Sequence, residues 1–120
     1  MSSAVFKRAA GGRAPRVKVA GLARLQFASA VEFLLAEAID LSESGMFIAG
    51  DEVTLATVGD LVDVHFEGAR DLVVKAAARV ARVVPPGGCF TPGIGIEFVR
   101  IGPDTEELIV RFVHRELARA

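Results

Sequence analysis

Three residues near the middle of the chain, Asp40, Ser42 and Gly45, have the types and spacing to bind a polar ligand. A carboxylate accepts hydrogen bonds, and a serine hydroxyl both donates and accepts them. Glycine tolerates positive φ and allows a close backbone approach. The same residue types also build ordinary tight β-turns. The segment 40–45 is therefore predicted to be either a ligand-binding turn or a purely structural one.

The remaining reactive side chains do not form a catalytic or metal-binding pattern. The histidines, His65 and His114, stand far apart without cysteine or carboxylate at metal-ligand spacing, and we expect both at the surface. Cys89 is the only cysteine, which excludes an intrachain disulfide, and its Pro/Gly-rich surroundings predict a loop. The motifs of serine hydrolases, P-loop proteins and zinc proteases are missing from the sequence. We expect a protein that is not an enzyme and uses no metal or cofactor.

Charge is divided unequally along the chain. Residues 1–31 carry six basic side chains and no acid, whereas the other 89 residues carry eight basic and fifteen acidic ones. A basic N-terminal segment of this kind can contact an anion or an acidic surface, or it can fold back on the acidic remainder of the same chain. Small residues without apolar periodicity predict a flexible basic arm over residues 1–15 and one folded domain over residues 16–120.

Apolar residues alternate along most of the domain, which predicts β-strands. Odd positions from Val17 to Phe27 face a core, and Gly21 between them marks a bulge or bend. A hairpin turn is expected at residues 67–71. The alanine-rich middle of residues 72–84 predicts a strand but also tolerates a helix. The expected strands are 17–27, 31–41, 46–48, 61–66, 72–84 and 94–98.

The C-terminal segment changes to helical period. Pro103 stands at a first-turn position, acidic residues follow it, and arginines lie toward the other end. Close strands followed by one helix predict an antiparallel barrel or sandwich that the helix caps. The apolar face of the helix is expected to contain Leu108, Ile109, Phe112, Val113 and Leu117.

The turn signature and its place among the strands resemble the PilZ domain family, whose pattern is D/N-x-S-x-x-G between two early strands. Residues 40–45 match this pattern, residues 93–98 look like the family's closing strand, and residues 102–104 look like the start of its C-terminal helix. The resemblance covers roughly residues 13–117. It implies a mainly β fold, a six-stranded antiparallel β-barrel with a C-terminal α-helix.

PilZ domains commonly bind cyclic di-GMP, so the resemblance implies that Asp40 and Ser42 hydrogen-bond a guanine edge or a phosphate. It also implies that Gly45 allows close backbone approach.

The family's second element is R-x-x-x-R in the arm, where two guanidinium groups clamp guanine and phosphate. Arg16 stands in the second arginine position, but Gly12 occupies the first and Arg13 is displaced by one residue. The loss of one such clamp weakens binding by roughly tenfold to a hundredfold.

Two functions agree with this sequence. The first is a cytoplasmic signalling protein that responds to cyclic di-GMP and acts on a protein partner in a motility or signalling system. The alternative is a PilZ-like adaptor that binds no nucleotide and regulates motility or a surface organelle through protein contacts. No nucleic acid is expected, because the chain lacks Trp and Tyr, and no membrane span, because apolar runs are short. The candidate ligand residues are Arg13, Arg16, Asp40, Ser42 and Gly45.

Overall fold

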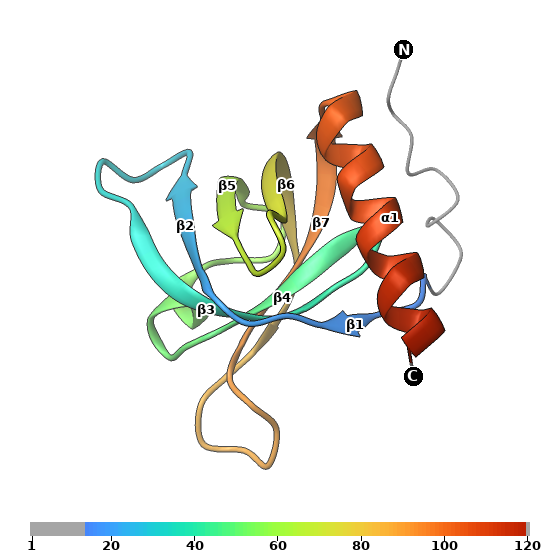
Figure 1. Cartoon of the computed structure of the whole chain (residues 1–120). Helices are drawn as coiled ribbons and strands as arrows, with labels where there is room; N and C mark the ends of the chain where they lie inside the picture. The colour runs from blue at the N-terminus through green and yellow to red at the C-terminus, as the bar shows by residue number, and fades with distance from the viewer. Residues whose placement is uncertain (1–13, 120) are drawn as a thin grey trace.

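The computed structural model describes residues 14–119, so most of the predicted arm (residues 1–15) lies outside the described residues. Seven strands, one 3-10 helix and one α-helix follow one another in this range (Figure 1). They are β1 (Val17–Lys18), β2 (Leu22–Phe27), β3 (Leu34–Leu41), β4 (Gly45–Ala49), the 3-10 helix (Glu52–Leu55), β5 (Leu61–Glu67), β6 (Val73–Val84), β7 (Gly93–Ile101) and α1 (Pro103–Arg119).

β1 and β2 are two parts of one strand that bends at Gly21. Both pair antiparallel with β3 along the same edge, with Val17 opposite Leu41 and Leu22 opposite Glu37. Gly21 has a φ of 143°. A side chain is strained at this φ, and a Cβ there would also lie 2.9 Å from the carbonyl oxygen of Glu67. The bend predicted within residues 17–27 is confirmed.

The strands close into a barrel. β2 pairs with β5, β5 with β6, β6 with β7, and β7 with β4, all antiparallel. β4 also pairs with the free edge of β3, which completes the ring. With β1 and β2 taken as one strand, residues 14–119 form a closed six-stranded antiparallel barrel, as expected.

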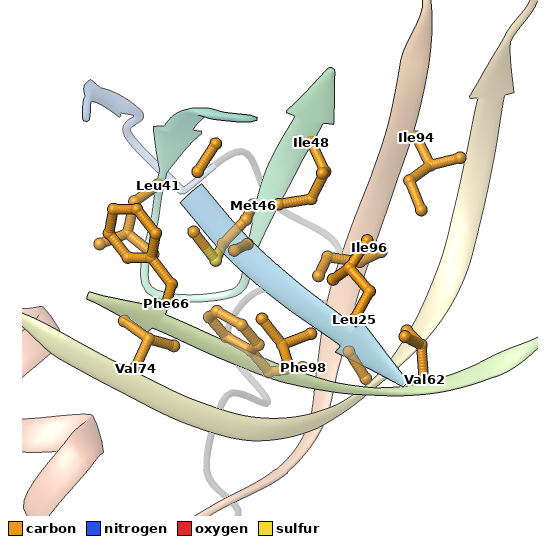
Figure 2. Packing of buried hydrophobic residues seen from close by; sticks show 14 of the residues in the cluster. Leu25, Leu41, Met46, Ile48, Val62, Phe66, Val74, Ile94, Ile96 and Phe98 are labelled. Carbon is orange, nitrogen blue, oxygen red and sulfur yellow. The ribbon is translucent and has the colours of Figure 1, made fainter. Parts of the chain in front are cut away.

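The core lies inside this ring because alternate residues of each strand point inward. Leu25, Phe66 and Ile96 are examples from three different strands, and Figure 2 shows such side chains meeting in the interior. The alanine-rich stretch of β6 is strand and not helix, since Ala77 pairs with Asp63 of β5 on one side and with β7 on the other. Residues 31–33, expected in the second strand, belong to the loop before β3.

The helix α1 packs against the barrel through Ile109, Phe112 and Val113, which are buried. The prediction that Leu117 belongs to this face is wrong, because Leu117 is 42% exposed. The last turn presents Glu116 to the barrel instead, where its carboxylate accepts a hydrogen bond from Nη1 of Arg70 at 2.8 Å. No helix within residues 14–119 is long and apolar enough to cross a membrane.

Candidate ligand-binding site at the β3–β4 turn

An ion pair joins the residue that precedes β1 to the turn signature. Arg16 directly precedes β1, and the pairing of Lys18 with Asp40 places this segment beside the end of β3. Nη1 of Arg16 donates a hydrogen bond to Oδ1 of Asp40 at 2.5 Å, and the two side chains are 42% and 26% exposed. An exposed pair of this kind contributes about 0–1 kcal/mol, so a ligand can exchange it for its own contacts at small cost.

Ser42 builds the turn with its hydroxyl. The residue is fully buried, and its Oγ accepts hydrogen bonds from the backbone N–H groups of Ser44 at 3.1 Å and Gly45 at 3.2 Å. Its own N–H donates to the carbonyl oxygen of Gly45 at 2.9 Å. The structural interpretation of the turn therefore holds for Ser42, and a direct contact between Ser42 and a ligand stays a prediction.

Gly45 allows a close approach between two strands. A Cβ at this position would lie 2.0 Å from the carbonyl oxygen of Ile96 on β7. The positive φ that glycine permits is not used, since Gly45 is not among the described residues with positive φ. Within the signature, Asp40 is thus the residue whose polar side chain is accessible, while Gly45 keeps the turn tight against β7.

Two residues that no motif in the sequence indicated, Phe47 and Arg82, extend the surface around Asp40. The register places Asp40 beside Phe47 of β4, Phe47 beside Gly95 of β7, and Gly95 beside Arg82 of β6. The guanidinium carbon of Arg82 lies 5.2 Å from the centroid of the Phe47 ring, which is cation–π distance. We call the outer surface formed by Arg16, Asp40, Phe47 and Arg82 the signature face.

Glycines make room for this arrangement. A Cβ on Gly93 would lie 2.9 Å from Cε2 of Phe47, and a Cβ on Gly95 would lie 3.0 Å from Nε of Arg82. Gly93 and Gly95 alternate with inward isoleucines, so both stand on the outer phase of β7. Two outward glycines in one strand were the signal in the sequence that other side chains lie across this strand.

The turn is also attached to the helix. Oε2 of Glu43 lies 3.6 Å from Nε2 of His114, and the Glu43 side chain is only 11% exposed. His114 is itself 68% exposed, as expected for a surface histidine. His65 is 32% exposed and lies 3.0 Å from Oε2 of Glu67, so it is half-buried on the outside of β5. The two histidines therefore belong to different parts of the surface and do not form one site.

The signature face combines one carboxylate with two guanidinium groups. The Asp40 carboxylate can accept hydrogen bonds from N–H groups on a heterocycle edge, and guanidinium groups can bind phosphate or stack on a ring. Of the predicted residues, the structure brings together Arg16, Asp40, Ser42 and Gly45 around one turn. Arg13, like Gly12, lies outside the described residues.

The PilZ domain family matches the chain over residues 12–115. None of the curated proteins matches it in sequence. Among solved structures, MotI/DgrA, the inhibitor of motility of Bacillus subtilis, is similar with a TM-score of 0.74 and 12% identity over 90% of this chain. The match covers 51% of MotI/DgrA, so the present chain spans about half of that protein.

Two isolated PilZ domains are similar over most of their lengths. The PilZ domain of YcgR from Escherichia coli, solved with c-di-GMP, has a TM-score of 0.71 and 15% identity over 90% of this chain and 92% of its own. The PilZ domain of CeSA from a cellulose-synthesizing bacterium has a TM-score of 0.59 and 17% identity over 84% and 96%. At these identities the likeness concerns the fold, and it agrees with the barrel and helix described above.

Proposed function

Because the chain belongs to the PilZ domain family, we propose that it is a cytoplasmic regulatory protein that binds cyclic di-GMP on the signature face. PilZ domains are binding and regulatory modules. The observation that carries the proposal is the Arg16–Asp40 pair, which brings the arginine before β1 to the accessible carboxylate of the signature turn. The YcgR domain, which shares this fold, was solved with the same ligand.

Within this proposal, Arg82 supplies a guanidinium group that Gly12 cannot. Arg82 is exposed on β6 and lies over Phe47, the direct neighbour of Asp40 across β3 and β4. A guanidinium held on an aromatic ring keeps its planar face available for stacking on guanine. The signature face therefore has two ordered arginines, although residues 12–16 contain only the second of the two arginines that the family pattern expects.

The other predicted residues have supporting roles in the same proposal. Ser42 and Gly45 fix the shape of the turn, so that Asp40 is held in place before the ligand arrives. Pre-positioning lowers the ordering cost of binding. Arg13 adds a further cation from the arm for a phosphate of the ligand.

Isothermal titration calorimetry with cyclic di-GMP tests the proposal. We expect saturable heat at micromolar protein, and a loss of affinity of roughly tenfold to a hundredfold in Arg16→Ala and in Asp40→Ala. Asp63→Ala, which removes a carboxylate from the outside of β5, is the matched control and should bind as the wild type does. A flat titration of the wild type at roughly tens of micromolar would rule out the proposal.

The second candidate is an adaptor that binds no nucleotide and regulates motility or a surface organelle through protein contacts. The observation in its favour is a row of exposed apolar side chains on the outside of the barrel, with Leu22 at 58%, Leu35 at 57% and Phe33 at 49% exposure. Function in a cell that survives an Arg13→Ala/Arg16→Ala double variant would support this candidate. Loss of function with the fold intact would count against it.

A further inference from the structure

A second outer face lies across β2, β3, β5 and β6. The register forms one row of outward side chains from Leu35 through Arg24 and His65 to Lys75. A groove of about 610 Å³ is lined by Arg24, His65 and Lys75 of this row, and Phe33 and Arg100 also line it. We call this surface, extended by the neighbouring Leu22, the groove face.

Cations outnumber acids among the residues that line the groove. Within residues 14–119, Arg24, Lys75 and Arg100 form no ion pair. Among the residues that line the groove, the one acid is Asp63, against these three cations. Glu67, which pairs with His65, lies beside the groove near Leu22. The part of the chain that the structure describes contains 11 basic and 15 acidic side chains, so a basic groove stands out from an acidic body. An acidic partner complements this charge.

Apolar side chains lie among these cations. Leu22 and Leu35 are both more than half exposed, and Phe33 is 49% exposed with the Arg24 guanidinium carbon 5.3 Å from its ring centroid. Leu35 pairs directly with Arg24, so the apolar and basic groups form one continuous surface. Protein interfaces are enriched in arginine and aromatic residues, and exposed apolar groups that cluster mark interaction sites.

We infer that the groove face docks a partner protein that presents acidic side chains around an apolar residue. The cations pair with the acids, while Leu22, Phe33 and Leu35 cover the apolar residue. The chain's own basic arm is a poor occupant, because residues 1–13 carry Lys7, Arg8 and Arg13 and no acid. The inference does not depend on nucleotide binding, since no residue of the signature face belongs to the groove.

Nuclear magnetic resonance with the ¹⁵N-labelled full chain tests this inference, with a short amphipathic peptide of Leu and Glu as the probe. We expect saturable shifts at the backbone amides of Leu22, Arg24, His65 and Lys75. A peptide with Lys in place of every Glu is the matched control and should cause none. Affinity should fall about tenfold in Lys75→Glu/Arg100→Glu and should weaken as salt is raised. The Arg111→Glu variant, on the exposed side of α1, should bind like the wild type.

Four outcomes would overturn the inference. The first is the absence of shifts at about 1 mM peptide, and the second is equal binding of the Lys peptide. The third is saturable binding of inorganic phosphate by the same amides, which would assign the groove to a free anion. The fourth is self-association of the chain, measured by sedimentation and abolished by Lys75→Glu, which would assign the face to a second copy. A failed cyclic di-GMP titration leaves each of these results unchanged, so the two proposals can fail separately.

Discussion

The two outer faces belong to one barrel but are built differently. The signature face is centred on β4 and the groove face on β5, which lie three strands apart in the six-stranded ring and hence on opposite sides. On the signature face each arginine already has a partner, Asp40 for Arg16 and the Phe47 ring for Arg82. On the groove face, Arg24 lies over the Phe33 ring, but Lys75 and Arg100 have no ion-pair partner among residues 14–119.

This difference shows how each face can recognise its ligand. Side chains that are already held in place bind a small ligand well, because binding then costs little conformational entropy. Exposed cations beside apolar side chains suit a large partner, since their charges also steer its approach. Substitutions on either face test this difference.

The largest effect is expected from Gly45→Ala. The new Cβ would lie 2.0 Å from the carbonyl oxygen of Ile96, so β4 and β7 must separate. Overpacking against a backbone atom should lower the free energy of unfolding by about 3 kcal/mol, or roughly 10 °C in Tm. Gly88→Ala is the control, because nothing lies within 4 Å of its Cβ. Equal melting temperatures in thermal unfolding would contradict the close pairing of β4 and β7.

A smaller loss of stability is expected when the phenylalanine of each face is removed. Phe47 is 7% exposed, so Phe47→Ala should lower the free energy of unfolding by about 2 kcal/mol in urea denaturation. Phe33 is 49% exposed, and Phe33→Ala should cost less than about 0.5 kcal/mol. A cost of the same size at both positions would mean that the two faces do not differ in packing.

The features that could be predicted from the sequence are those that depend on the residue pattern of a single strand or helix. The alternation in residues 61–66 correctly placed Val62, Val64 and Phe66 in the core. The helical period alone placed Leu117 on the buried face, but it does not show how far the barrel surface extends along the helix. At the last turn, Glu116 contacts Arg70 of the barrel and Leu117 is exposed.

The same limit applies to the candidate site. The turn at residues 40–45 was recognisable from local residue types, and the proximity of Arg16 followed from the resemblance to a known family. Phe47 and Arg82 were missed because their contact depends on the register of β4, β7 and β6, which only barrel closure determines. A single strand carries no information about which residue of another strand lies beside it.

A moderate effect on ligand affinity is expected from Arg82→Gln. Loss of the guanidinium that lies over Phe47 should weaken cyclic di-GMP binding about fivefold in calorimetry. Arg100→Gln removes a comparable charge from the groove face and should leave the affinity unchanged. Equal affinities for wild type and Arg82→Gln, with Arg16→Ala still impaired, would remove Arg82 from the site and keep the rest of the proposal.

The smallest effect is expected on stability when the Arg16–Asp40 pair is broken. Both side chains are partly exposed, so Arg16→Gln should lower the free energy of unfolding by less than about 1 kcal/mol. The difference should shrink further between about 0.05 M and 0.5 M salt in urea denaturation. A large loss of stability in low and high salt alike would show that Arg16 supports the fold through packing and is no readily exchanged ligand contact.

The closed ring also has a consequence for folding kinetics. The β3–β4 hairpin that carries Asp40 joins neighbouring segments, and hairpins form within roughly 1–10 μs. The pairing of β2 with β5 and of β4 with β7 joins segments that are distant in sequence, which makes barrels fold in roughly milliseconds to seconds. We therefore expect the signature turn to form early and transiently, whereas the groove face exists only after the slow step that closes the barrel.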